Sequence, residues 1–379
     1  MMPPASGSRI LMTTDAVGGV WIFATGLARA LGAAGLQVTL VTLGPRPTPA
    51  QRDVLGGAPG ISVVETDLKL EWQDPAGLDV VNAAALLHDI AQRFAPDIVH
   101  LNGFREANLK WPAPTVLVAH SCVNTWASSC GETACFADEP WNTYSAAVRA
   151  ALSNADVWVA PTAAFGDQIA QQYGVPRSGH VIWNGIDEIH GKPAARRPVI
   201  LGAGRVWDKA KNLSALAAIA PGVDWPVRIA GRTEPDQRES SRSGQNCEFT
   251  GELAHQALLH EMRHAGIFVS PARYEPFGLS VLEAASSGCA LVLSDIATFR
   301  ELWDGAALFV DPRDPDALRR SVQSVCRDDV QRTRLQRAAA ERSRRYPLRQ
   351  TAAAYRSIYA SLLASSGAGA RSLTTGASA

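Results

Sequence analysis

The chain has 379 residues, and its 36 Lys and Arg balance its 36 Asp and Glu, so the formal net charge is +0. Balanced charge gives no long-range attraction to nucleic acid or to an anionic membrane, and we expect no nucleic acid partner, while peripheral membrane contact stays open without support. The length exceeds the size at which one hydrophobic core usually stops growing, which predicts two domains with a ligand site in the cleft between them.

Targeting signals and metal-binding patterns are weak in this sequence. No apolar run approaches the roughly 18 residues of a membrane span, and Met1–Ser8 lacks the basic and apolar regions of a signal peptide. No basic amphipathic helix supports peripheral membrane contact. We therefore expect a cytoplasmic protein.

Cys122, Cys130 and Cys135 form the one local cysteine group, but their spacing matches no paired zinc pattern, so free thiols are expected and no metal site.

Apolar strand-like runs alternate with helical patterns in the first half, which is typical of βαβ units and a parallel sheet. Strands are expected at residues 10–12, 38–43, 61–64, 98–101, 115–119 and 157–160, and helices at 21–32, 80–94 and 141–154. This order predicts an α/β, doubly wound, Rossmann-like domain over residues 1–184.

A second series of the same kind follows a Pro- and Arg-rich linker at residues 192–198. Strands are expected at 199–202, 227–230, 247–250, 267–270, 291–293 and 307–310, and helices at 213–219, 254–264 and around Glu283. We predict a second Rossmann-like domain over residues 185–345, a last amphipathic helix over 346–364, and a disordered Ser/Gly/Ala/Thr-rich tail over 365–379.

The segment from Ser270 to Glu301 is the most informative, because it sets two carboxylates around a strand-to-helix turn. Pro276 suits the first turn of a helix, so Glu275 would lie in the turn and Glu283 about two turns along the helix. At a rise of about 1.5 Å per residue the two stand on the order of 10 Å apart, which suits the two ends of an elongated polar ligand. As a bare pair they would instead be solvated or helix-capping carboxylates.

Backbone N–H groups near glycine offer two places for an anion. The helix start at Phe277, Gly278 and Leu279 leaves N–H groups free, and Gly278 allows close approach of a ligand to the backbone. Gly18 and Gly19 follow the first strand and open the first helix, although a tight turn alone would also need glycine there. The order G-x-G-x-x-G is absent, which argues against a dinucleotide cofactor.

Two basic side chains of the second half can meet a leaving diphosphate. Arg205 ends a strand, and Lys211 lies six positions on, near a helix start. Lys209 competes with Lys211, which we prefer because Asn-Leu follows it. On their own these would be solvated surface charges. The sequence Asp314-Pro315-Asp316 is interpreted as a helix N-cap and first turn rather than as a metal site.

Taken together, these residues resemble the retaining family 4 (group 1) glycosyltransferases over nearly the whole chain. Glu275 and Glu283 match the two ends of the family's Glu-x7-Glu signature, and Arg205 with Lys211 resembles its Arg and Lys motif. The resemblance implies the GT-B fold, in which two Rossmann-like domains face each other and a C-terminal helix crosses back to the first. The first domain would be the acceptor side and the second the donor side.

The resemblance also implies residue roles. Glu275 would face the donor sugar, Glu283 would bind the ribose hydroxyls, and Arg205 with Lys211 would contact the pyrophosphate. His120, at a strand end, would bind the donor sugar near the reaction centre. The usual His-Ser/Asp-His form is reduced here to His120-Ser121-Cys122, so any role of a second His is lost.

Further positions match the family less specifically. Gly18 and Gly19 would border the donor phosphates and the acceptor pocket. Residues 184–187, Asn-Gly-Ile-Asp, resemble a domain-junction element with Trp183 in place of proline, and we interpret them as a turn or hinge. Secondary candidates are Arg273, Tyr274, Arg300 and Glu301.

The expected function is retaining, metal-independent transfer of a hexose from a nucleoside-diphosphate sugar, with a UDP-sugar favoured, to an unidentified hydroxyl acceptor in glycan biosynthesis. The catalytic candidates are His120, Arg205, Lys211 and Glu275, and no cofactor is expected. Residues 121–141, rich in Trp, Cys and Ser, are a candidate acceptor lining. The alternatives are a GT-B epimerase or phosphorylase, or a non-catalytic sugar-nucleotide-binding partner.

Overall fold

The computed structural model describes residues 7–177, 179–187, 195–233 and 245–375, with side chains described as far as residue 366. The chain divides into two compact units. Unit 1 holds the residues up to Ala127, Glu132–Gly185 and those from Leu348 on. Unit 2 holds Ser128–Gly131 and Ile186–Pro347.

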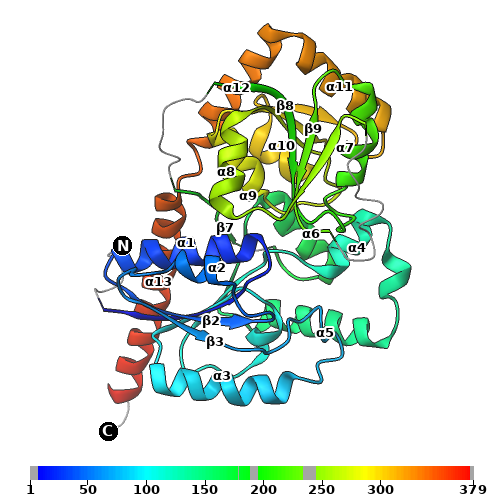
Figure 1. The fold of residues 1–379 in the computed structure, drawn as a ribbon. Coiled ribbons are helices and arrows are strands. Elements are labelled where there is room, and N and C mark those ends of the chain that lie inside the picture. Colours follow the sequence, from blue (N-terminus) through cyan, green and yellow to red (C-terminus); the bar gives the residue numbers. More distant parts are fainter. Residues whose placement is uncertain (1–6, 178, 188–194, 234–244, 376–379) are drawn as a thin grey trace. The chain divides into compact units, whose positions relative to one another are not determined.

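Unit 1 is built on a parallel sheet in the order β3-β2-β1-β4-β5-β6-β7. Helices α1 and α3 lie on opposite faces of this sheet (Figure 1). The strand order reverses between β1 and β4, and in doubly wound sheets ligands bind at this point, beyond the carboxyl ends of the strands. The strands are β1 (Arg9–Asp15), β2 (Gln37–Leu43), β3 (Ile61–Glu65), β4 (Ile98–Leu101), β5 (Thr115–Val118), β6 (Val157–Ala160) and β7 (His180–Val181). The helices are α1 (Gly19–Ala33), α2 (Pro49–Asp53), α3 (Val80–Phe94), η1 (Arg105–Asn108), α4 (Val123–Cys130), η2 (Thr133–Phe136), α5 (Glu139–Asn154) and α6 (Ala163–Tyr173).

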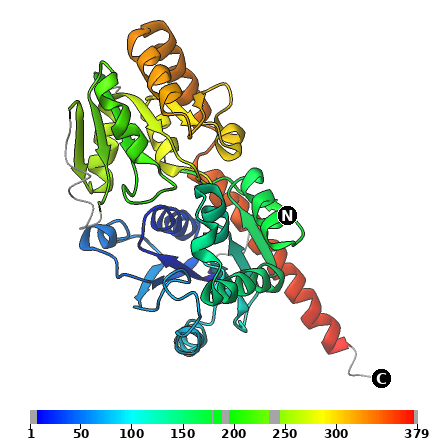
Figure 2. The same cartoon turned by 90° about the vertical axis from the view of Figure 1, so that its right-hand side faces the viewer.

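The last helix, α13 (Leu348–Thr375), belongs to unit 1 and packs on α1. Figure 2 shows it as a long red helix that extends beyond the sheet. The helix continues past residue 364, where the sequence analysis expects a disordered tail. An existing helix extends by fixing one residue at a time, which costs less than starting a new helix.

Unit 2 is built on a second parallel sheet, in the order β10-β9-β8-β11-β12-β13. Side chains of β11 alternate between two cores, since Phe268 packs with α8 and α9 while Ile267 and Val269 pack with α7 and α11. The strands are β8 (Arg197–Ala203), β9 (Val227–Ala230), β10 (Cys247–Gly251), β11 (Ala265–Ser270), β12 (Ala290–Ser294) and β13 (Leu308–Val310). The helices are α7 (Leu213–Ile219), η3 (Ala220–Gly222), α8 (His255–His264), α9 (Leu279–Ser286), α10 (Ala297–Trp303), α11 (Pro315–Arg327) and α12 (Asp329–Ser343).

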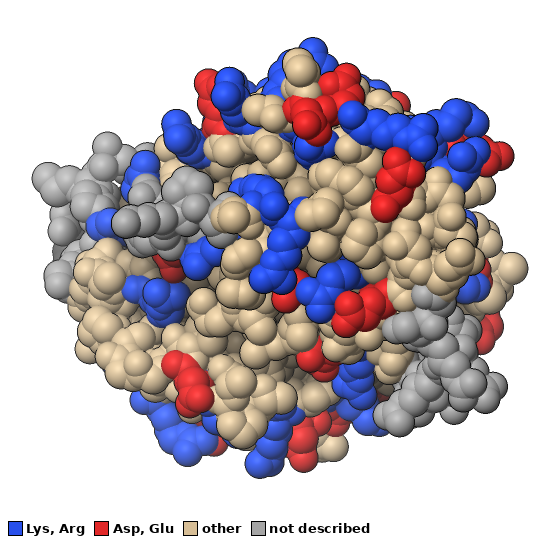
Figure 3. Space-filling view, turned by 45° about the horizontal axis from the view of Figure 1, so that its top comes forward, with Lys and Arg blue, Asp and Glu red and all other residues tan. Residues whose placement is uncertain are grey.

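The expected pair of doubly wound Rossmann-like sheets is confirmed. Among the described residues, none of the helices combines the length and apolar character that crossing a bilayer requires. On the face drawn in Figure 3, Lys and Arg side chains lie among Asp and Glu side chains. All six cysteines are free thiols.

Candidate functional site

The strand order of unit 2 reverses between the neighbouring strands β8 and β11. Because both strands are parallel, the loops that follow them, 204–212 and 271–278, start from the same edge of the sheet. A backbone hydrogen bond from the N–H of Arg273 to the carbonyl of Ala210 (2.8 Å) ties the two loops together. This edge is the position at which open α/β sheets bind ligands.

Lys211 and Glu275 come from these two loops and contact each other directly. The Nζ of Lys211 lies 2.5 Å from Oε2 of Glu275, and their side chains are 22% and 11% exposed. The hydroxyl of Thr298 donates to the carbonyl of Glu275 (2.7 Å) and holds the turn. Lys209, the competing candidate, is exposed. The structure therefore brings Lys211 to the Glu275 turn.

Arg205 is held by a carboxylate that the sequence analysis did not single out. Its Nη2 and Nε donate to Oδ2 of Asp208 at 2.6 and 3.1 Å, while Oδ1 of Asp208 accepts from the N–H of Ala210 (2.9 Å). The Asp208 side chain is 3% exposed and that of Arg205 is 38% exposed. Buried Asp208 thus fixes a guanidinium that still reaches solvent; an Asp three residues after an Arg was its only sequence signal.

The turn after Glu275 differs from the expectation for Pro276. Gly278 is the N-cap of α9 with φ 87, a left-handed conformation that cannot belong to a right-handed helix. Helix α9 therefore begins at Leu279, so Pro276 precedes it and Glu283 lies about one turn along rather than two. In the described chain the N–H groups of Leu279 and Ser280 have no hydrogen-bond acceptor, which leaves them free for an anion.

Two residues of the signature are buried. The side chain of Phe277, a donor-site candidate, packs in the unit 2 core against Tyr346. Glu283 is 4% exposed at its side chain, and its Oε1 lies 2.7 Å from Nε2 of His255 at the start of α8. This hydrogen bond to Glu283 raises the pKa of His255. This pair could not be recognised in the sequence, because a 28-residue separation between two different helices has no recognisable period.

His120 lies at the corresponding edge of unit 1, after β5, and Asn102 follows β4. Nδ2 of Asn102 donates to the carbonyl of Thr13 (2.7 Å), which turns Oδ1 toward Nε2 of His120 (2.7 Å). That oxygen can only accept, so Nε2 of His120 carries the proton and Nδ1 is left as an acceptor. Burial lowers the pKa of His120 to about 3, so its imidazole is neutral at physiological pH.

Gly18 and Gly19 lie in unit 1 after β1. Gly18 is the N-cap of α1 with φ 88, and Gly19 is the first helical residue. Both are exposed. The N-terminus of α1 has no side-chain cap, and it follows the carboxyl end of β1.

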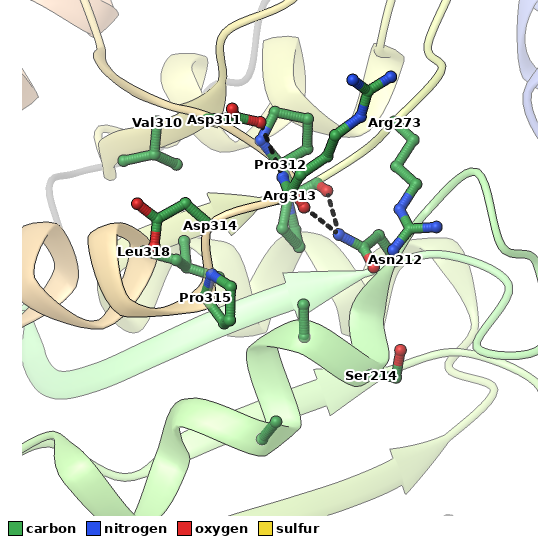
Figure 4. A pocket seen from close by; sticks show the side chains of 13 residues that line it. Asn212, Ser214, Arg273, Val310, Asp311, Pro312, Arg313, Asp314, Pro315 and Leu318 are labelled. Carbon is green, nitrogen blue, oxygen red and sulfur yellow. Dashed lines mark hydrogen bonds between the residues drawn. The ribbon is translucent and has the colours of Figure 1, made fainter. Parts of the chain in front are cut away.

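A pocket of about 460 Å³ lies between α7 and α11, which cover the face of the unit 2 sheet opposite to α8 and α9 (Figure 4). Nδ2 of Asn212 donates to the carbonyls of Pro271 (2.9 Å) and Pro312 (3.2 Å), which joins the loops after β8, β11 and β13. Arg273 and Arg313 line this pocket. Asp314 caps α11 by accepting from the N–H of Ala317 (2.8 Å), which confirms the helix-cap interpretation.

Of the other secondary candidates, Tyr274 is buried and Arg300 is ion-paired. Tyr274 is 6% exposed. Arg300 donates to both oxygens of Asp295 at 2.6 and 2.7 Å and lies over the ring of Phe309, and Glu301 follows it on α10. Within the residues that the structure describes, no three His, Cys, Asp or Glu side chains gather as a group that could hold a metal ion.

Comparison with known proteins covers both units. The family model "Glycosyltransferase Family 4" matches residues 17–189, and "Glycosyl transferases group 1" matches residues 197–328. A glycogen synthase of Mycobacterium tuberculosis is 27% identical over 367 residues, covering 86% of each chain. A phosphatidyl-myo-inositol mannosyltransferase of Mycobacterium leprae is 32% identical over 157 residues, covering 39% of this chain and 42% of the relative.

Solved structures share the fold at low sequence identity. Sucrose-phosphate synthase of Thermosynechococcus elongatus has a TM-score of 0.80 at 20% identity, covering 94% of this chain and 100% of the other. HepE of Anabaena in complex with UDP and glucose has a TM-score of 0.70 at 16% identity, covering 94% and 100%.

Proposed function

This chain belongs to the family 4 (group 1) glycosyltransferases and has their GT-B fold, and we propose that it transfers a hexose from a nucleoside-diphosphate sugar to a hydroxyl acceptor with retention of configuration. It is an enzyme of sugar transfer in glycan biosynthesis. One observation carries the finer proposal. Arg205 and Lys211 are fixed by Asp208 and Glu275 at the edge of unit 2 where the strand order reverses.

The main catalytic requirement is to stabilise the leaving diphosphate, which carries about two negative charges. Arg205 presents a planar fork of N–H donors and Lys211 a point charge, and both suit phosphate oxygens. The free N–H groups at the start of α9 add donors at the positive end of a helix. These groups supply the positive charge that a divalent cation supplies elsewhere, so the proposed reaction needs no metal.

Glu283 is proposed to bind the ribose hydroxyls of the nucleotide. Its Oε1 is engaged by His255, and its Oε2 has no hydrogen-bond partner in the described part of the chain. His255 would then act as a positioning residue that fixes the carboxylate. A UDP-sugar is the favoured donor, in line with the complexes of Anabaena HepE with UDP and with UDP-glucose.

His120 is proposed to accept a hydrogen bond from a hydroxyl of the donor sugar. Its Nδ1 is the free acceptor, since Nε2 donates to Asn102. As the bond to the diphosphate breaks, the sugar would gain oxocarbenium character. The acceptor hydroxyl would attack from the face that the diphosphate leaves and pass its proton to a phosphate oxygen.

Thermal stabilisation of the purified protein by UDP-, GDP- and ADP-sugars tests the donor site, because a ligand that binds only the folded state raises its stability. We expect a selective rise in Tm with one nucleotide, unchanged by EDTA. A rise that requires Mg²⁺ would contradict metal independence. No rise with any of the sugars would contradict the donor site, and a rise without turnover would favour a non-catalytic binding protein.

Substitution of the two cations tests their role in catalysis. Arg205→Ala and Lys211→Ala should each lower kcat by about 10²-fold with little loss of stability, as removal of other charge-stabilising groups does. Lys209→Ala and Arg313→Ala remove exposed cations of the same two types and serve as matched controls. Equal rates in all four variants would contradict the diphosphate assignment.

A further inference from the structure

A carboxyl group lies near the edge of the unit 1 sheet that holds His120. Glu71 lies in the loop after β3, and its Oε2 accepts two backbone hydrogen bonds, from the N–H of Phe104 (2.9 Å) and from that of Arg105 (3.0 Å). Those two residues follow β4 almost directly. The Glu71 carboxyl is therefore fixed next to the loop in which Asn102 holds His120.

The loop after β4 lies directly against Glu71. A Cβ on Gly103, the residue after Asn102, would stand 4.0 Å from Oε2 of Glu71. On the other side, the hydroxyl of Tyr144 accepts from the N–H of Val123, three residues after His120 (3.2 Å). Burial raises the pKa of Tyr144, and the negative charge of Glu71 contributes to this rise.

The other oxygen of the Glu71 carboxyl, Oε1, is not used to hold the loops together. Both backbone hydrogen bonds go to Oε2, and within the part of the chain that the structure describes Oε1 has no partner. The Glu71 side chain is half-buried rather than enclosed. The next residue, Trp72, is 44% exposed, which is unusual for a large apolar side chain. A fixed carboxyl oxygen and an exposed indole thus belong to consecutive residues of one loop.

The protonation of Glu71 bears on what it can bind. Burial and the nearby carboxylate of Glu106 raise the pKa of Glu71 to about 7, against the lowering effect of Arg105 and the two backbone N–H groups. Arg105 itself donates to Asp74 (2.9 Å), so its charge is already compensated. A carboxyl that is protonated for part of the time both donates and accepts hydrogen bonds, which suits a hydroxyl better than a cation.

We propose that Glu71 and Trp72 recognise the acceptor, and that the acceptor presents a polyhydroxylated ring, a sugar or a cyclitol. Oε1 of Glu71 would hydrogen-bond a ring hydroxyl, while the indole of Trp72 would cover an apolar C–H face of the ring. This inference rests on the proposed glycosyl transfer, and it assigns the acceptor class to residues of the β3–α3 loop.

The test separates acceptor recognition from donor chemistry. Transfer from the preferred nucleotide-sugar is measured with maltose, maltotetraose, methyl α-D-mannoside and myo-inositol, and hydrolysis of the donor is measured without an acceptor. Glu71→Ala and Trp72→Ala should raise the acceptor KM by about tenfold or more, with the rate of donor hydrolysis unchanged. Glu71→Gln, which keeps both backbone hydrogen bonds and a polar second atom, and Trp72→Phe, which keeps a ring face, should stay within about threefold of the wild type.

Each result has a distinct meaning. An unchanged acceptor KM in both alanine variants overturns the proposal, as does an equal loss of donor hydrolysis and transfer, because a merely structural role would lower both. Hydrolysis of the donor with no transfer to any of the four polyols overturns the acceptor class alone. A wild-type protein that neither binds nor hydrolyses any nucleotide-sugar overturns the proposed function, and this inference falls with it.

Discussion

The imidazole of His120 has a defined protonation state because its neighbours leave no alternative. Asn102 is oriented by the carbonyl of Thr13, so its Oδ1 accepts from Nε2 of His120. The ring of His120 also packs edge-on against Phe23, with ring centroids 4.6 Å apart. A neutral ring whose Nδ1 only accepts can bind a hydroxyl, but it cannot supply a proton to the leaving diphosphate. In the proposed reaction, the leaving group would therefore depend on Arg205 and Lys211.

Exclusion of a proton from His120 should also appear in the pH dependence of stability. Its folded pKa of about 3 lies below the usual value of about 6.5, so the unfolded chain takes up a proton as pH falls below 6.5 and the folded chain does not. Stability is present above pH 6.5 and is lost toward pH 5, by at most about 2 kcal/mol for this group. His120→Gln should make the fall in Tm between pH 7 and pH 5 smaller.

An exposed histidine provides the control for this measurement. His260 lies on the surface of α8, and His260→Gln should leave the fall in Tm as steep as in the wild type. The buried His100, whose pKa burial also lowers to about 3, remains in every variant and sets a common background. If the His120→Gln and wild-type curves ran parallel, His120 would take up a proton in the folded state.

At the scale of the elements, helix α13 is fixed to unit 1 by a buried polar contact. Nδ1 of His100, in the centre of β4, lies 2.7 Å from the hydroxyl of Tyr359 on α13. Tyr355, one turn earlier, packs edge-on against the same imidazole at 5.1 Å, but its buried hydroxyl has no partner among the described residues. One helix thus carries two buried tyrosines, of which one forms a hydrogen bond with the sheet.

This difference gives a prediction with an internal control. Tyr359→Phe should destabilise the protein by about 1–3 kcal/mol, because it leaves the buried imidazole of His100 without a partner. Tyr355→Phe removes a hydroxyl that has none, so it should be neutral or slightly stabilising. Urea unfolding of both variants measures the difference. Equal losses of stability would show that the 2.7 Å contact with His100 contributes nothing specific.

Elements whose pattern is local could be predicted from the sequence, and contacts between distant loops could not. Strands such as 98–101 and 227–230 are continuous apolar runs, and their bounds agree with β4 and β9. Helix α12 was missed because Arg and Ala dominate it and few of its side chains are buried. Helix α6 was missed although Phe165, Ile169 and Tyr173 repeat at the helical spacing of four.

The candidate site divides in the same way. Glu275, Glu283, Arg205 and Lys211 stand in recognisable local motifs, so they could be selected before the structure was known. Their partners could not, because the pairings of His255 with Glu283 and of Asn102 with His120 depend on which loops lie side by side at a sheet edge. Sequence spacing carries no information on such contacts until strand order is fixed.

At the scale of the whole molecule, and apart from the short segment Ser128–Gly131, the chain passes between the two units at two neighbouring positions. The division falls at Gly185 and Ile186 and again at Pro347 and Leu348. Ile186 forms a parallel bridge with Pro347, and its N–H donates to the carbonyl of Tyr346 (3.3 Å). On the unit 1 side, the hydroxyl of Thr351 donates to the carbonyl of Trp183 (2.9 Å). Contacts on both sides of the division therefore hold the two segments together.

Gly185 packs against the start of α13, so its substitution tests the junction. A Cβ there would stand 2.6 Å from the Thr351 hydroxyl oxygen and 2.7 Å from the backbone nitrogen of Leu348. The backbone of Leu348 would have to move to make room. Gly185→Ala should therefore shift the start of α13 and lower the free energy of unfolding by about 1–3 kcal/mol, as overpacking in a core does. Gly179→Ala is the matched control, since a Cβ at Gly179 meets nothing within 4 Å. Thermal unfolding compares the two variants, and the rate of donor hydrolysis shows whether the shift reaches the active site. If Gly185→Ala were as stable as Gly179→Ala, the two segments could move apart to fit a methyl group without loss of stability. Residues 184–187 would then be a flexible linker and not a tightly packed junction.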